Sequence, residues 1–67
     1  MTMLDERLAR VTALAQDVWG NEIDAHAFMT TPHPMLGGNR PAEHAVTDPG
    51  AREVEQILHA LALGLPV

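Results

Sequence analysis

The sequence predicts an all-α fold, a small compact bundle of four helices, two of them long and two short. Apolar residues recur at intervals of three and four, the spacing that places side chains on one face of a helix. No segment alternates apolar and polar residues as a half-buried strand does. A chain of 67 residues has the size of one domain, so we expect a single helical domain over residues 1–67.

The first long helix is expected over residues 4–19. Its buried stripe is formed by Leu4, Leu8, Val11, Ala15 and Val18, which repeat at helical spacing. Trp19 lies beside this stripe and is expected to cover the edge of the core. Gly20 follows, and glycine readily takes the left-handed conformation that ends many helices.

A short second helix is expected over residues 22–29, with Asn21 as its N-cap. Ile23 and Ala27 are expected to form its inner face together with Phe28. The helix must end before Pro32, because the residue that precedes a proline avoids helical backbone angles.

A loop is expected over residues 30–39, and a short third helix over residues 40–46. Proline and glycine at the loop's two ends direct the chain away from regular structure. Met35 and Leu36 are apolar, so we expect both to insert into the core. Asn39 is expected to cap the third helix. Arg40 could cap the preceding carbonyls or contact a partner.

The fourth helix is expected to run over residues 51–63, with Thr47 or Asp48 as its cap, Pro49 in its first turn and Gly64 closing it. The buried stripe comprises Val54, Ile57, Leu58 and Leu61. On the exposed side, Asp48 with Arg52 and Glu55 with His59 are four residues apart and are predicted to pair.

The charge of the chain argues against several classes of partner. The net charge is −5, with four arginines and no lysine, whereas nucleic-acid binders and proteins of anionic membrane surfaces carry basic patches. No segment resembles a signal peptide or a membrane span. The absence of cysteine fits a reducing compartment. We therefore expect a cytoplasmic protein whose partner is a basic protein.

Catalysis and metal binding are not expected. The histidines His26, His33, His44 and His59 show no metal-ligand spacing. Neighbouring carboxylates such as Glu53 and Glu55 point apart on a helix. No cofactor is therefore expected, and the chain is predicted not to be an enzyme.

The second half of the chain resembles the toxin-binding domain of the Xre/MbcA/ParS-type antitoxins. The matching motifs are, in order, Phe28-Met29, Thr31-Pro32-His33, Leu36-Gly37-Gly38, Pro41, Thr47-Asp48-Pro49-Gly50 and the helix from Leu58 to Gly64. The resemblance covers the last forty residues or so densely. Phe28-Met29 stands in place of the family's usual Trp-Leu pair, and Ala42 follows Pro41 where the family has a larger apolar residue.

The resemblance implies an antitoxin that binds a RES-domain toxin, an enzyme that degrades NAD, and obstructs its active site without performing chemistry. Members of this family often carry an N-terminal helix-turn-helix that binds DNA, and none is expected in these 67 residues. The resemblance also places the toxin contacts at the C-terminal end of the domain.

An apolar patch at the C-terminus is the expected contact site. At 100° per residue, Leu63 falls opposite the buried stripe of its helix, and an exposed apolar patch often marks an interaction surface. The residues expected to bind the partner are Arg52, Gln56, His59, Leu63, Leu65, Pro66 and Val67. Two alternatives remain open: the patch joins two copies of the chain as a homo-oligomer, or the chain is an orphan remnant without a toxin.

Overall fold

The computed structural model describes the backbone of residues 3–65 and the side chains of residues 6–65, and this part of the chain is helical without strands. The elements are α1 (Met3–Trp19), α2 (Glu22–Thr30), the 3₁₀ helix η1 (Pro34–Leu36), α3 (Pro41–His44) and α4 (Asp48–Ala62). The predicted all-α class, with two long and two short helices, is confirmed. None of these helices has the length and hydropathy needed to cross a membrane.

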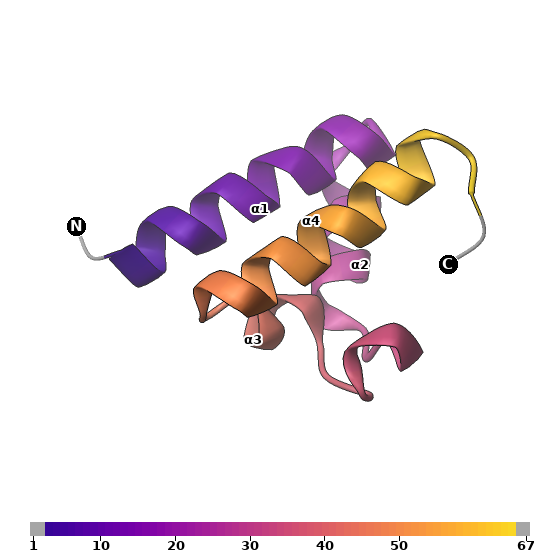
Figure 1. The fold of residues 1–67 in the computed structure, drawn as a ribbon. Coiled ribbons are helices and arrows are strands. Elements are labelled where there is room, and N and C mark those ends of the chain that lie inside the picture. The colour runs from indigo at the N-terminus through magenta and orange to yellow at the C-terminus, as the bar shows by residue number, and fades with distance from the viewer. Residues whose placement is uncertain (1–2, 66–67) are drawn as a thin grey trace.

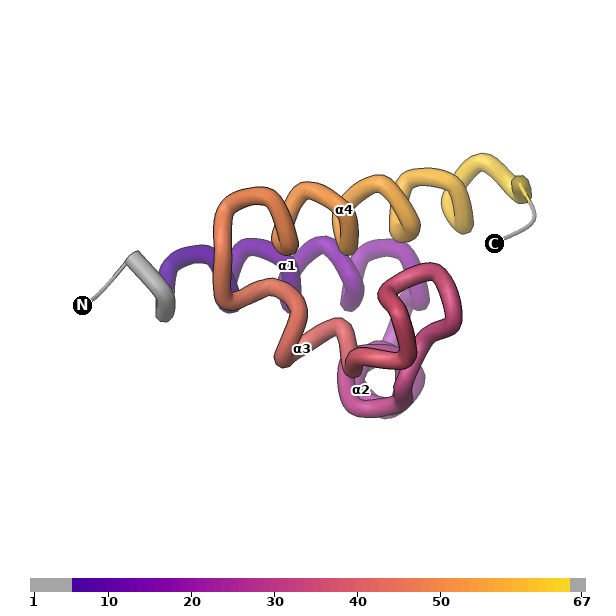
Figure 2. Tube along the Cα trace, turned by 60° about the horizontal axis from the view of Figure 1, so that its bottom comes forward, coloured from indigo at the N-terminus to yellow at the C-terminus, as the bar shows by residue number. Residues whose placement is uncertain are grey.

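The two long helices, α1 and α4, lie side by side and run in the same direction (Figures 1 and 2). A parallel pair needs a connection that returns to the starting end, and α2, η1 and α3 provide it. The helix α2 crosses beneath the long pair and also packs against α1 (Figure 1). This arrangement brings the C-terminal ends of α1 and α4 to the same end of the molecule.

The core lies between α1, α2 and α4. Its members, all buried, are Val11, Ala15, Ala25, Met29, Leu36, Ala45, Ala51, Val54, Ile57 and Leu58. Burying a side chain such as Leu58 stabilises the fold by about 1.5–3 kcal/mol. The predicted stripes of α1 and α4 are confirmed at Val11, Ala15, Val54, Ile57 and Leu58, while Leu8, Val18 and Leu61 are partly buried against them. Leu4, also assigned to the α1 stripe, lies outside the residues whose side chains are described.

Most helix boundaries lie where the sequence placed them. The Asn21 side chain accepts a hydrogen bond of 2.8 Å from the backbone N–H of Asp24, and the Thr47 side chain accepts one of 3.1 Å from Gly50. These bonds satisfy N–H groups that have no partner within the helix. Gly20 follows α1 with a φ of 78°, as expected of a helix-ending glycine.

The third helix is shorter than predicted, ending at His44 rather than at residue 46, and its cap differs. Arg40 occupies the N-cap position without a side-chain capping bond. The Asn39 amide instead lies 3.3 Å from Nδ1 of His44. Arg40 donates from Nε to the carbonyl oxygen of Thr30, at 2.9 Å, so this side chain caps the last turn of α2.

The predicted inner face of α2 is confirmed at Phe28, which is partly buried against the core, and was wrong at Ile23 and Ala27. Ile23 is 81% exposed and Ala27 is also exposed, whereas Ala25 and Met29 are buried. A helix of nine residues has two possible apolar stripes, and local spacing does not rank them. Packing against α1 and α3 selects the stripe with Ala25 and Met29.

The prediction for the loop was half right, because Leu36 is buried but Met35 is 59% exposed. Both residues belong to η1, in which successive side chains are about 120° apart because a 3₁₀ helix has three residues per turn. Only one of two adjacent side chains can therefore face the core.

The predicted ion pairs within α4 are replaced by pairs between helices. Nε of Arg7 lies 2.5 Å from Oδ1 of Asp48, and Nε of Arg10 lies 3.3 Å from Oε1 of Glu55. Since α1 lies beside α4, its arginines reach these carboxylates in place of the residues one turn further along α4.

Candidate functional site

The outward side of α4 carries four of the residues that the sequence assigns to partner binding. Arg52, Gln56, His59 and Leu63 are all exposed and follow one another at intervals of four, three and four, so they form one ridge. With a rise of 1.5 Å per residue, this ridge is about 16 Å long. Leu63 ends it and is 76% exposed.

A Schellman motif closes α4 and fixes the direction of the chain after Leu63. The backbone N–H of Leu65 donates to the carbonyl of Ala60, at 2.9 Å, and that of Gly64 donates to Leu61, at 3.1 Å. Gly64 has a φ of 76°, which favours glycine. These bonds are the two that define the motif, and they turn Leu65 back toward α4.

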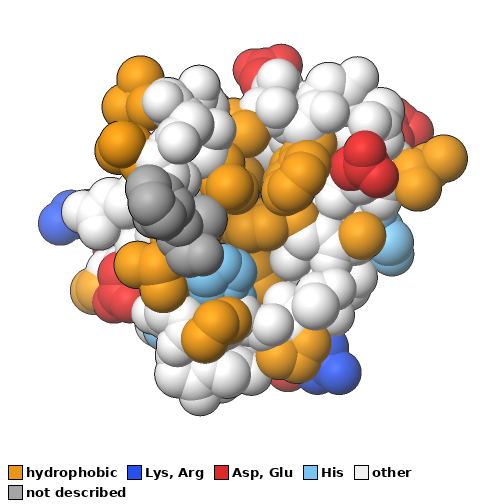
Figure 3. Space-filling view, turned by 90° about the vertical axis from the view of Figure 1, so that its right-hand side faces the viewer, with side chains coloured by type: hydrophobic (Ala, Val, Ile, Leu, Met, Phe, Trp, Pro, Cys, Tyr) orange, Lys and Arg blue, Asp and Glu red, His pale blue; other side chains and the backbone are white. Residues whose placement is uncertain are grey.

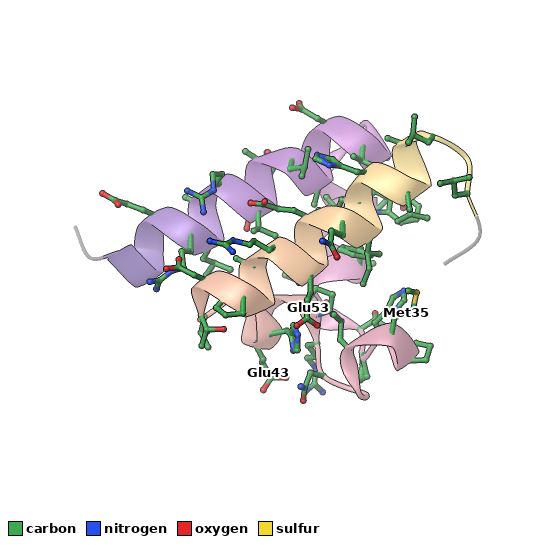
Figure 4. The ribbon with its side chains drawn as sticks, viewed as in Figure 1. Met35, Glu43 and Glu53 are labelled. Carbon is green, nitrogen blue, oxygen red and sulfur yellow. The ribbon has the colours of Figure 1, made fainter. Side chains whose placement is uncertain are left out.

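Leu65 lines a cleft of 230 Å³ between α4 and η1. The cleft is bounded by Met35, Leu36, Glu53, Gln56, Ile57, Ala60 and Leu65. In Figure 4, Met35 stands on η1 and Glu53 extends from α4. Leu65 is 54% exposed, so it forms part of the cleft wall and still offers apolar surface to a partner.

An aromatic cleft of 360 Å³ lies between the end of α1 and α2. Its lining includes Trp19, Asp24, Phe28 and His33. The ring centroids of Trp19 and Phe28 are 6.1 Å apart, and those of Phe28 and His33 are 6.2 Å apart. The end of the molecule where α1 and α4 finish shows hydrophobic side chains gathered around a hollow (Figure 3).

A third groove, of 650 Å³, lies along α1 and α2. Leu8, Thr12 and Gln16 provide its α1 wall, and Ile23 and Met29 belong to its α2 wall. It holds none of the residues that the sequence assigned to the site. Ile23, which was predicted to lie on the inner face of α2, lines this groove instead.

The structure brings together some of the predicted site residues and separates others. Gln56 and Leu65 share the cleft against η1, and His59 and Leu63 are neighbours on the ridge. Arg52 lies toward the other end of α4, where its positive charge contributes to lowering the pKa of Asp48. Pro66 and Val67, also assigned to the site, lie outside the described residues.

The sequence placed Met35 in the core and Trp19 at its edge, and assigned neither residue to the contact site. Both side chains are exposed, Trp19 to 39% and Met35 to 59%. An apolar residue in a short proline-rich and glycine-rich loop was the available signal for Met35, and it was interpreted as core filling.

The described polar groups of this region bond mainly within the fold. Among the described side chains, no three His, Asp or Glu residues are placed to hold a metal ion. Nδ1 of His33 accepts a hydrogen bond from the N–H of Met35, at 3.1 Å, and Nε2 of His44 lies 3.1 Å from Oε2 of Glu53. These histidines connect parts of the fold, and the exposed apolar surface is suited to binding a protein.

Comparison with known proteins identifies the family. Residues 14–64 match the model of the antitoxin Xre/MbcA/ParS C-terminal toxin-binding domain. The match extends from within α1 to the glycine that closes α4, and so includes the ridge and the aromatic cleft, but not Leu65 of the cleft against η1. No curated protein and no solved structure matches the chain. The matched range covers well over half of the sequence, and the chain therefore belongs to the antitoxin Xre/MbcA/ParS C-terminal toxin-binding domain family.

Proposed function

We propose that this domain neutralises a RES-type, NAD-degrading toxin in the cytoplasm by covering the entrance to its active site. The contact surface is the α4 ridge with the residues that follow it, namely Arg52, Gln56, His59, Leu63, Leu65, Pro66 and Val67. The observation that carries the proposal is the exposure of Leu63, at 76%, at the end of a ridge of polar side chains.

Both the apolar end of this surface and the charge of the domain support binding to a toxin. Burying one leucine against a partner is worth about 1.5–3 kcal/mol, which corresponds to roughly a tenfold to hundredfold change in affinity. The net charge of −5 steers the domain toward a basic partner. The domain supplies no reacting group in this proposal, so inhibition depends only on occupancy of the toxin.

Co-expression with a RES toxin tests the proposal. The wild-type domain should restore growth and co-purify with the toxin, whereas Leu63→Glu should do neither, because it places a charge in the apolar contact. Ile23→Glu is the matched control, since Ile23 is equally exposed, at 81%, but lies outside the proposed surface. If Leu63→Glu and a deletion of residues 65–67 both left neutralisation intact, the surface would be assigned wrongly.

Self-association is a second candidate, favoured by the exposure of Ile23 beside the groove of α1 and α2. Exposed apolar surface on a small domain is often covered by a second copy, which also stabilises the fold. Sedimentation of the isolated domain at several concentrations distinguishes a dimer from a monomer. Ile23→Glu should abolish a dimer formed through this groove and leave toxin binding unchanged.

A further inference from the structure

We infer that the aromatic cleft lined by Trp19, Asp24, Phe28 and His33 receives an arginine side chain of the protein partner. This inference rests on the proposed function for the identity of the partner as a toxin. It adds a second contact, made by α1 and α2, to the one made by α4.

The shape of the cleft suits a flat cationic group. Trp19 is 39% exposed and its ring lies 6.1 Å from that of Phe28, with 42° between the planes. Tryptophan is the aromatic side chain that attracts cations most strongly. Asp24 is the acidic residue of the lining, so a guanidinium in the cleft would meet an aromatic face and a carboxylate together.

The corner between α1 and α2 carries negative charge that the described side chains leave uncompensated. Elsewhere, Asp48, Glu55 and Glu43 pair with arginines, and Glu53 pairs with His44, while Glu6 near the start of α1 has no ion pair among the described side chains. Asp17, Glu22 and Asp24 have no ion pair among the residues whose side chains are described, and all three are exposed. This charge is complementary to a basic side chain of the partner.

The hydrogen bonds of Asp24 leave room for such a ligand. Its Oδ2 accepts from the Asn21 amide at 2.9 Å, and no hydrogen bond within the described part of the chain uses Oδ1. The ligand is expected to be arginine and not lysine. A guanidinium can stack on an aromatic ring while the N–H donors in its plane reach a carboxylate held in one orientation.

Fluorescence of the isolated domain tests the cleft without the toxin. The chain contains one tryptophan, so the signal reports on Trp19 alone. Acetyl-arginine amide should change this fluorescence saturably, acetyl-lysine amide more weakly, and the neutral acetyl-citrulline amide not at all. Equal responses to the arginine and citrulline probes would overturn the inference.

Asp24→Asn keeps an oxygen that can accept from Asn21 but removes the negative charge. It should weaken binding of the arginine probe about tenfold, which is the loss expected for one charge-assisted hydrogen bond. Glu6→Gln, which removes an exposed carboxylate outside the cleft lining, is the matched control and should bind as the wild type does. An unchanged affinity in Asp24→Asn would exclude the proposed role of the carboxylate.

Affinity for the toxin separates this inference from the proposed function. Asp24→Asn and Trp19→Leu should each bind the toxin about tenfold more weakly, with circular dichroism confirming that both variants fold. If both bound as tightly as the wild type while Leu63→Glu lost binding, the arginine cleft would be refuted and the α4 surface retained. If Leu63→Glu also bound normally, the proposed function would fail. The fluorescence titration, which needs no toxin, would still test whether the cleft binds arginine.

Discussion

Arg7 of α1 and Asp48 of α4 form an ion pair between residues 41 positions apart in the chain, with Nε of Arg7 2.5 Å from Oδ1 of Asp48. The Arg7 side chain is 18% exposed, and its Nη1 also lies 3.4 Å from the carbonyl oxygen of Val46. The pair therefore joins the first turn of α4, and the segment before it, to the beginning of α1.

The Arg7–Asp48 pair predicts a dependence of stability on pH. The hydrogen bond from Arg7, assisted by its charge, holds the pKa of Asp48 below the ordinary value of 3.8. A depressed folded-state pKa stabilises the protein above the ordinary pKa, and this contribution is lost as the pH falls through the folded-state pKa. Asp48→Asn should therefore unfold at a lower temperature than the wild type at pH 7, and the difference should shrink below pH 3.8.

Thermal unfolding followed by circular dichroism, at pH 7 and again below pH 3.8, measures the difference in unfolding temperature between wild type and Asp48→Asn. Arg7→Gln should show the same narrowing at acid pH, because it removes the other partner of the pair. The double variant should unfold at the same temperature as the less stable of the two single variants, because the ion pair can be lost only once. A gap between wild type and Asp48→Asn that stayed constant down to the acid limit would contradict the assigned role of the pair.

Gly50→Ala should destabilise the fold by about 1–3 kcal/mol, the usual cost of overpacking. In an ordinary helical position the same change stabilises by about 0.4–1 kcal/mol. At Gly50, however, an added Cβ would overlap the backbone carbonyl of His44. Urea denaturation measures the sign of the effect. Ala13→Gly, at an exposed position of α1, is the control that measures the effect of helix propensity alone. A stabilised Gly50→Ala variant would exclude the close approach between Gly50 and the carbonyl of His44.

Leu58 and Leu63 compare the two sides of α4 with the same substitution. Leu58 is completely buried, whereas Leu63 is 76% exposed. Leu58→Ala should cost about 2–5 kcal/mol of unfolding free energy, while Leu63→Ala should change it by at most about 0.5 kcal/mol. Equilibrium denaturation provides both values, and similar losses at the two positions would show that Leu63 belongs to the core.

Substitutions at the adjacent residues Met35 and Leu36 of η1 should have different effects, one on toxin binding and the other on the stability of the fold. Leu36→Ala should destabilise the domain by about 2–5 kcal/mol, since Leu36 is buried. Met35→Glu should leave unfolding nearly unchanged and weaken toxin binding, because Met35 and Leu65 line the same cleft. Denaturation and calorimetric titration of the two variants test this. A Met35→Glu variant that bound normally would place the cleft outside the interface.

Much of the local structure followed from the sequence. Asn21, Thr47 and Gly64 set helix boundaries through hydrogen bonds that span only a few residues. The exposure of Leu63 could also be predicted, because the four apolar residues on the opposite side of α4 define its buried face. Such features depend on interactions within one helix, and the spacing of residues along the chain describes those directly.

Contacts between elements decided the remaining features. The sequence alone determined an all-α chain, the helix boundaries at Asn21, Thr47 and Gly64, and the outward side of α4. Only the tertiary structure decided that Arg7 and Arg10 would take the carboxylates of α4, that Ile23 and Met35 would be exposed, and that Trp19 and Phe28 would border a cleft. The physical reason is that short helices allow more than one apolar face, and packing against residues distant in sequence selects among them.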